Sequence, residues 1–136
     1  MAGYSLKPLV DKLGIRDHTR VLLVNQPPDY FQWLGKDISS QVLKNKGVPD
    51  LVHLFAYSKK EFEQLLQKIL PLTVSHPAIV IWVSWLKKSS GMAADLTETD
   101  IRNYALLHQL VDIKVCAVSN DWSGLKLVVP LKKRAG

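Results

Sequence analysis

The sequence predicts an α/β fold with a mostly parallel sheet and an antiparallel last strand, and three observations support this prediction. Continuous apolar runs, typical of strands buried on both faces, alternate with segments whose apolar residues recur every three or four positions. Such alternation implies parallel strands joined by right-handed crossovers through helices. The last two runs are separated only by a short polar turn, so we expect them to pair as an antiparallel hairpin.

Four helices are predicted from their boundary residues. The first is expected to be capped by Ser5, with Pro8 near its start and Gly14 as its stop. Ser58 and Glu61 have the spacing of a capping box at the start of the third helix, which we expect Pro71 to end. The four helices are placed at Ser5–Leu13, between Asp29 and Gly35, from Ser58 to Pro71, and from Thr97 along a face that reaches Val111.

Five apolar runs, each bounded by polar residues, proline or glycine, are predicted to be strands. The five runs are Arg20–Asn25, Leu51–Tyr57, Ala78–Trp85, Ile113–Val118 and Leu125–Leu131. The segment Ile38–Leu43 is ambiguous, and the interpretation offered for it is a short edge strand. Asp112 and Lys114 are two residues apart at the amino end of the fourth strand, so we expect them to share a face and to belong to a structural ion pair or network.

Length and charge define the expected domain organisation. The 136 residues, 47% of them hydrophobic, fit one domain over residues 1–131 and a basic C-terminal tail over residues 132–136. Half of the formal charge of +6 lies in Lys132, Lys133 and Arg134. We interpret the tail as a solvated end, because three charges neutralise few phosphates, and nucleic acid is not an expected partner.

Cysteine content and hydropathy predict a cytoplasmic protein without membrane contact. The single Cys116 excludes an internal disulfide, which favours a reducing compartment, and we interpret it as a small buried apolar residue. The longest apolar run, Ala78–Val83, is far shorter than the roughly 20 residues of a membrane helix. The N-terminus lacks the apolar core of a secretory signal.

Six segments resemble a family of short, uncharacterised bacterial proteins, a domain of unknown function. The segments are Tyr4-Ser5, Lys12-Leu13-Gly14-Ile15, Trp85-Leu86-Lys87-Lys88-Ser89-Ser90-Gly91, Asp95-Leu96-Thr97-Glu98, Val111-Asp112-Ile113-Lys114-Val115-Cys116-Ala117 and Trp122-Ser123-Gly124-Leu125. The resemblance covers nearly the whole chain. It implies an α/β fold and a bacterial cytoplasmic setting, and it implies no established activity.

The predicted order of elements also resembles the Rossmann-like fold of class I methyltransferases, a three-layer α/β/α sandwich. This resemblance implies that the last strand inserts beside Ala78–Trp85, in a shortened fold with little room for the usual second and third strands. Methyltransferases place a glycine-rich loop after the first strand, where the cofactor approaches the backbone. The corresponding loop here, Asn25-Gln26-Pro27-Pro28-Asp29, has no glycine and two prolines without N–H donors. We therefore expect no cofactor, and neither a Walker A loop nor GxGxxG occurs.

A ligand site is predicted at the carboxyl edge of the sheet, where open parallel sheets bind their ligands. If the last strand pairs beside Ala78–Trp85, the hairpin turn lies near two consecutive lysines. Ammonium groups, hydroxyls and an indole suit an anion or a phosphorylated ligand with a flat ring. The alternative is a solvated lysine loop, with the indole covering the core. The predicted ligand-binding residues are Asn25, Ser58, Lys87, Lys88, Ser89, Ser90, Trp122 and Ser123.

No catalytic residue and no metal site are predicted. The four histidines are far apart and lack nearby cysteine or paired carboxylates in metal-ligand spacing. His53 lies in a predicted strand and is interpreted as a hydrogen-bonded core residue. Asp95 and Glu98 flank a helix start and are interpreted as capping and dipole partners.

Three functions are consistent with the sequence. The first is a non-catalytic module that binds a small anionic or nucleotide-like ligand. The second is a degenerate S-adenosylmethionine-dependent methyltransferase. The third is a protein-interaction domain that uses exposed aromatic residues such as Tyr30, Phe31 and Trp33. The sequence assigns neither an enzymatic activity nor an oligomeric state.

Overall fold

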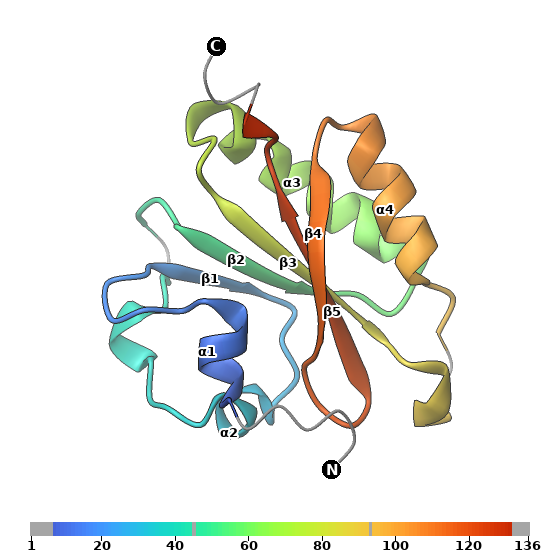
Figure 1. Ribbon diagram of the computed structural model, residues 1–136, viewed down its shortest axis with the longest axis horizontal. Helices are drawn as coiled ribbons and strands as arrows, with labels where there is room; N and C mark the ends of the chain where they lie inside the picture. The colour runs from blue at the N-terminus through green and yellow to red at the C-terminus, as the bar shows by residue number, and fades with distance from the viewer. Residues whose placement is uncertain (1–6, 45, 93, 132–136) are drawn as a thin grey trace.

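A computed structural model describes residues 7–44, 46–92 and 94–131, which form a five-stranded mixed sheet between two layers of helices (Figure 1). The strand order is β1-β2-β3-β5-β4. Strands β1 to β3 are parallel, and β5 is antiparallel to both β3 and β4. The strands are β1 (Val21–Val24), β2 (Leu51–Phe55), β3 (Val80–Leu86), β4 (Val111–Ala117) and β5 (Trp122–Val128). This is the predicted α/β fold, with the last strand inserted beside the third.

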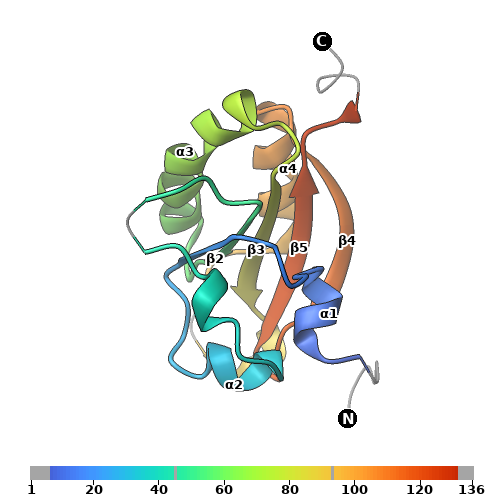
Figure 2. The same ribbon diagram turned by 90° about the vertical axis from the view of Figure 1, so that its left-hand side faces the viewer.

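The helices divide between the two faces of the sheet. Helices α3 (Lys59–Ser75) and α4 (Glu98–Leu107) cover one face, and α1 (Leu9–Leu13) lies on the other, as the two orthogonal views show (Figures 1 and 2). The short helix α2 (Tyr30–Leu34) packs with α1 in the same apolar cluster. The two faces therefore bury separate cores, one under α3 and α4 and one under α1 and α2.

The helix boundaries confirm the predicted caps but not every predicted end. The Ser58 and Thr97 hydroxyls accept hydrogen bonds from the N–H groups of Glu61 and Asp100, so they cap α3 and α4. Helix α1 begins only at Leu9, with Pro8 as its N-cap, and the predicted cap Ser5 lies outside the described residues. The basic tail at residues 132–136 also lies outside them.

Pro71 does not end α3, which continues to Ser75, so this part of the prediction is wrong. A proline removes only the one backbone hydrogen bond from its own nitrogen, and hydroxyl groups of the next turn add hydrogen bonds to carbonyl groups beside the proline. The Thr73 hydroxyl donates to the Leu70 carbonyl at 2.6 Å, and the Ser75 hydroxyl donates to the Pro71 carbonyl at 3.4 Å. Leu72, beyond the proline, packs against the core and favours a helical last turn.

Two further segments differ from the prediction. Ile38–Leu43 contains a single 3₁₀ turn, Ser39–Gln41, and only one isolated bridge joins Val42 to Val21. Helix α4 ends at Leu107, and Val111 begins β4 instead of extending the helix face. The chain reverses between these elements at Gln109, which adopts a left-handed conformation with φ of 65°.

The last strand begins three positions earlier than predicted, at Trp122 instead of Leu125, so Gly124 lies inside β5 and not in the turn. The reason is close packing on the face that carries Trp82. A Cβ atom at Gly124 would lie 3.1 Å from a Val118 methyl group and 3.3 Å from the Trp82 ring. Glycine thus fits this point of the central strand without displacing its neighbours, whereas a larger residue would have to push them aside.

The outer strand β4 contains an irregularity that separates two residues predicted to share a face. The register shifts between Asp112, which pairs with Leu127, and Lys114, which pairs with Lys126. Because Leu127 and Lys126 are consecutive, Asp112 and Lys114 point to opposite faces. Asp112 instead forms an ion pair with Arg102 of α4 at 3.1 Å, and Lys114 shares its face with Lys126.

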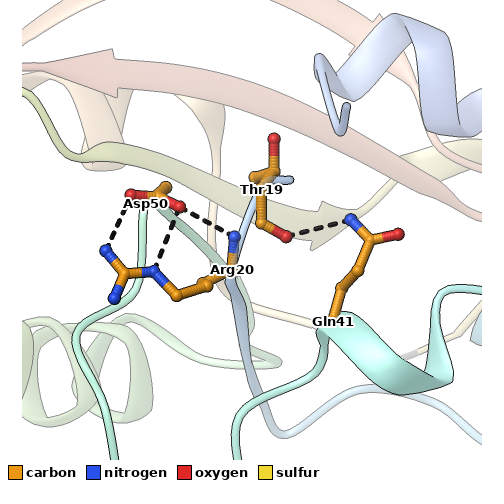
Figure 3. Close-up of polar contacts among 4 residues, drawn as sticks. All are labelled: Thr19, Arg20, Gln41 and Asp50. Carbon is orange, nitrogen blue, oxygen red and sulfur yellow. Dashed lines mark hydrogen bonds and ion pairs between the residues drawn. The ribbon is translucent and has the colours of Figure 1, made fainter. Parts of the chain in front are cut away.

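Polar contacts hold the amino ends of β1 and β2 together (Figure 3). The Asp50 carboxylate accepts hydrogen bonds from the Arg20 backbone N–H at 2.8 Å and from the Arg20 guanidinium at 3.3 and 3.4 Å. The Arg20 backbone N–H is the main group that lowers the pKa of the Asp50 carboxyl, and the guanidinium adds to this effect. The Gln41 amide donates to the Thr19 carbonyl at 3.0 Å, which attaches the 3₁₀ turn to the same edge (Figure 3).

Replacing Pro71 by alanine should stabilise the protein. The alanine N–H can donate to the carbonyl four residues earlier, and relief of the proline penalty should outweigh the added entropy of the unfolded chain by about 1–2 kcal/mol. Urea unfolding of Pro71→Ala measures this change. Lys68→Ala, an exposed position on the same helix, is the control and should alter stability by less than about 0.5 kcal/mol. Equal or lower stability of Pro71→Ala would contradict the prediction.

Candidate functional site

A cleft of about 700 Å³ lies where the carboxyl end of β3 meets the amino end of α4. Its walls come from the end of β3, the loop that follows, and the first turn of α4. The lining residues are Trp85, Leu86, Lys87, Lys88, Met92, Ala94, Asp95, Leu96, Thr97, Glu98 and Thr99. The cleft therefore lies at the sheet edge where the sequence analysis expects a ligand.

The two consecutive lysines form the basic part of this cleft. The Lys87 N–H donates to the Asp121 carbonyl at 2.8 Å, so the hairpin turn lies directly beside the lysine segment. Lys88 begins a 3₁₀ turn that ends at Gly91, where φ is 75°. Within the described part of the chain, neither lysine forms a salt bridge. Their positive charges are thus available to an anion in the cleft.

The acidic residues of the cleft are engaged in the protein's own contacts. The Glu98 carboxylate pairs with Arg102. One Asp95 carboxylate oxygen accepts from the Lys59 N–H at 2.9 Å, so Asp95 assists the start of α3 and not the α4 start that it precedes in the sequence. Thr97 and Asp100 exchange hydrogen bonds in a capping box. Glu98 and Asp100 place two carboxylates in the first turn of α4, so the partial positive charge of this helix end is offset by the protein's own acidic groups.

The predicted serine and asparagine residues lie at several separate places along the carboxyl edge of the sheet. Ser89 and Ser90 lie in the 3₁₀ turn after Lys88, and the Ser90 hydroxyl accepts from the Met92 N–H at 3.1 Å. The Ser58 hydroxyl is occupied as the cap of α3. The Asn25 amide donates to the Phe55 carbonyl at 2.9 Å and so connects the ends of β1 and β2. None of these four side chains lines the cleft itself.

The two predicted hairpin residues, Trp122 and Ser123, have different surroundings in the structure. Trp122 lies opposite Leu86 in the sheet, but its side chain is only 4% exposed and packs in the core under α1 and α2. Ser123 pairs with Trp85 on one side and Ala117 on the other. The expected adjacency of turn and lysines is thus present in the backbone, whereas the indole is buried on the opposite face from α4.

Sequence reasoning did not single out several residues that the fold brings to this edge. Leu96, Thr97 and Thr99 line the cleft because they surround the start of α4. Tyr57, just after β2, is 41% exposed, and its ring contacts Trp122. The signal for Tyr57 was its place at the end of the predicted strand Leu51–Tyr57, but the sequence did not show which way its ring points.

A buried chain of hydrogen bonds crosses the other core. His53 Nδ1 lies 2.9 Å from the Tyr30 hydroxyl, and His53 Nε2 lies 2.7 Å from Ser84 Oγ. Burial lowers the pKa of His53 to about 3, and burial raises the pKa of Tyr30. All three side chains are fully buried, so they are inaccessible to a substrate and act structurally. This confirms the interpretation of His53 and removes Tyr30 from the predicted exposed aromatic group, in which Phe31 is 45% exposed and Trp33 is partly buried.

Residues 7–44, 46–92 and 94–131 contain one cysteine, Cys116, which lies in β4. Burial raises the pKa of the half-buried Cys116 thiol, as expected of a residue that packs as a small apolar group. No group of three histidine, cysteine or carboxylate side chains in these residues could hold a metal ion. No helix there has the length and apolar character needed to span a bilayer.

A second hollow of about 460 Å³ lies at the opposite, amino edge of the sheet. Its lining includes Arg20, Asp50 and His76. The guanidinium of Arg20 is already paired with the Asp50 carboxylate, so the lining of this hollow, unlike that of the first cleft, offers no lysine or arginine without an ion pair. The carboxyl-edge cleft is therefore the stronger candidate site.

Comparison with known proteins gives matches in structure alone. No family model matches the sequence, and no curated protein matches it. A DhpI–SAH complex aligns with a TM-score of 0.58 at 9% identity, over 90% of this chain and 83% of the other. The fold is Rossmann-like and methyltransferase-like.

Two bacterial structures align with similar quality. A protein of the NADB-Rossmann superfamily from Streptococcus agalactiae aligns with a TM-score of 0.56 at 9% identity, over 94% of this chain and 70% of the other. The tRNA methyltransferase TrmK of B. subtilis aligns with a TM-score of 0.53 at 10% identity, over 95% and 68% of the two chains. At these identities the comparisons establish the fold and leave the activity of this chain undetermined.

The loop after β1 does not fit the cofactor of these methyltransferases. Pro27 and Pro28 have no N–H to donate, and the Pro27 carbonyl accepts from the Tyr30 N–H at 3.1 Å. Asn25, in this loop, has a left-handed backbone conformation with φ of 61°. Its side-chain amide already donates a hydrogen bond to the Phe55 carbonyl. In the described part of the chain, β1 is the last strand on its side of the sheet, where only Val42 forms an isolated bridge to Val21, so no neighbouring strand there carries an acidic residue for a ribose. The described residues therefore do not form the cofactor cradle that the fold family implies.

Protonation of His53 should make the protein less stable in acid. The pKa of His53 is lowered from 6.5 to about 3 on folding, so the neutral form contributes its full stability above pH 6.5 and that contribution is lost as the pH falls. One extra proton bound by the unfolded state lowers the unfolding free energy by about 1.4 kcal/mol per pH unit. Urea titrations between about pH 6.5 and pH 4.5, above most carboxyl titrations, should show this slope.

A variant comparison identifies the group responsible. His53→Gln should lose most of the slope, whereas His76→Gln, which removes an exposed imidazole, should keep it. An identical slope in His53→Gln and the unmodified protein would show that another group titrates.

Proposed function

We propose that this chain is a non-catalytic module that binds a small anionic ligand, such as a phosphorylated metabolite, at the carboxyl edge of its sheet. The observation that carries the proposal is the cleft at the end of β3, where Lys87 and Lys88 have no acidic partner among the described residues. We also infer a cytoplasmic location, because Cys116 has no second cysteine with which to form a disulfide in this sequence.

The composition of the cleft supports an anion with an apolar portion. Two ammonium groups can form charge-assisted hydrogen bonds with phosphate or carboxylate oxygens. Trp85, Leu86 and Leu96 supply apolar surface beside these polar groups. A volume of about 700 Å³ lies within the range of small-molecule sites, roughly 300–1,000 Å³.

Within this proposal, the predicted site residues have different roles. Lys87 and Lys88 contact the ligand directly. Ser89, Ser90 and Ser123 lie at the rim, where a larger ligand can reach their hydroxyls. Asn25, Ser58 and Trp122 act indirectly, because they hold the ends of β1, β2 and β5 in place.

Removing the two lysine charges should abolish anion binding. Thermal denaturation with and without millimolar AMP or ribose 5-phosphate should show a ligand-induced rise in Tm for the unmodified protein and none for Lys87→Ala with Lys88→Ala. The rise in the unmodified protein should shrink at high salt, because exposed charges are screened.

The control is Lys44→Ala with Lys46→Ala, which removes the same charge at the opposite edge of the sheet. This variant should retain the full rise in Tm. An equal loss in both double variants would indicate an effect of net charge instead of a site. Failure of every anionic compound to raise the Tm of the unmodified protein would refute the proposal.

A degenerate methyltransferase that still holds S-adenosylmethionine is the second candidate, favoured by the fold comparison alone. The proline-containing loop after β1 argues against it, because the backbone lacks the donors and the space that close approach needs. Calorimetric titration with millimolar S-adenosylmethionine should therefore show no saturable binding. A dissociation constant well below millimolar would establish this second function and displace the first.

A further inference from the structure

Three lysines gather on the face of the sheet that carries α1. Lys114 of β4 pairs directly with Lys126 of β5, and Lys126 pairs with Trp82 of β3 on its other side. The Trp82 indole N–H donates to the Leu13 carbonyl at 2.9 Å, which attaches the last turn of α1, where Lys12 lies, to this part of the sheet. We call Lys12, Lys114 and Lys126 the basic patch.

The charges of α1 and β4 act on the same point of the sheet. Cys116 lies two residues after Lys114, so the two side chains share a face. Burial raises the pKa of the Cys116 thiol, while the charges of Lys12 and Lys114 act on it in the opposite direction. Both ammonium groups therefore lie close to this part of β4.

The basic patch has no acidic partner among the described residues. Asp112 points to the opposite face, where it pairs with Arg102. Asp11 precedes Lys12 on α1, but successive residues of a helix point about 100° apart, so their charged groups diverge. Like charges directly opposite each other in a sheet destabilise it. An anionic group placed between the two paired lysines would relieve this repulsion.

This part of the sheet is open to a partner. Figure 1 views this face, with α1 to the side of β4 and β5 and no helix drawn in front of them, whereas α3 and α4 cover the opposite face. Lys114 is exposed, and Lys12 and Lys126 are half-buried. A helix of another chain could therefore pack here, as α3 and α4 do on the other side.

The spacing of the lysines favours carboxylates over phosphates. Side chains directly opposite each other in a sheet have Cβ atoms about 5 Å apart, and residues four apart on a helix have Cβ atoms about 5–6 Å apart. One helix can thus place a carboxylate against each of the paired lysines. Three lysines neutralise few phosphates, so nucleic acid fits this surface less well.

We propose that the basic patch is a docking surface for an acidic helix of a partner protein, with carboxylates four residues apart. The patch lies on the opposite face of the sheet from α4, whereas the carboxyl-edge cleft is lined by the start of α4. This inference is therefore independent of the proposed anion binding.

Two matched peptides test the proposal. One is an alanine-rich helix of about 20 residues with glutamates four residues apart, and the other has glutamine in place of each glutamate. Calorimetric titration at low salt should show binding of the glutamate peptide alone. Lys114→Ala with Lys126→Ala should weaken this binding roughly tenfold or more. Lys44→Ala with Lys46→Ala, which removes the same charge beside β1, should bind like the unmodified protein.

Cys116 reports where the peptide binds, because it is the only cysteine of the chain. It lies on the same face as Lys114 and is half-buried. The glutamate peptide should therefore slow alkylation of Cys116 by iodoacetamide. The same peptide concentration should give no protection in Lys114→Ala with Lys126→Ala.

Several results would overturn the proposal. The glutamate peptide could fail to bind, lose affinity equally in both double variants, or bind without protecting Cys116. Tighter binding of an oligothymidylate of the same net charge, lost in Lys114→Ala with Lys126→Ala, would assign the surface to nucleic acid. Dimerisation of the unmodified protein that this variant abolishes would assign the surface to a second copy. Thermal unfolding of each variant verifies that the fold is retained.

Discussion

The pairing of β3 with β5 is the interaction on which the rest of the molecule depends. Because β5 runs antiparallel between β3 and β4, the hairpin turn reaches the same edge as the end of β3. This places Asp121 against Lys87 and Trp122 beneath Tyr57. Gly124 lies in the middle of this pairing, where Trp82 and Val118 approach closely and leave little space for a side chain. The two halves of the edge are thus held together by a close contact in the middle of the sheet.

The sequence was sufficient to predict features that depend on local chemistry. The caps at Ser58 and Thr97 followed from side-chain oxygens at the proper spacing, and the insertion of β5 followed from the resemblance to a known architecture. The prediction that Pro71 ends α3 was wrong, because the packing of Leu72 in the next turn is a tertiary effect. The face occupied by Trp122 depends on where β5 begins, and a difference of three residues at the strand start placed the residue in a turn.

The candidate site lies at a different loop from the one to which the shared fold points. The fold comparison directs attention to the loop after β1, but there the prolines and the bonded Asn25 leave little for a ligand to contact. Two lysines without an ion pair follow the end of β3, and the exposed ring of Tyr57 lies near the end of β2. Because a site depends on particular side chains and not on topology, this edge gives a better guide to the ligand than the methyltransferase likeness does.

The outer strand β4 has a consequence for the behaviour of the protein at high concentration. An edge strand presents unpaired backbone groups that can template the addition of another chain. Here the register shift beside Asp112 disturbs the regular ladder, and Lys114 and Lys126 place two like charges side by side on one face. A second copy that approached this edge would meet a kinked strand and electrostatic repulsion. The hairpin that completes the sheet thereby also opposes its extension into larger aggregates.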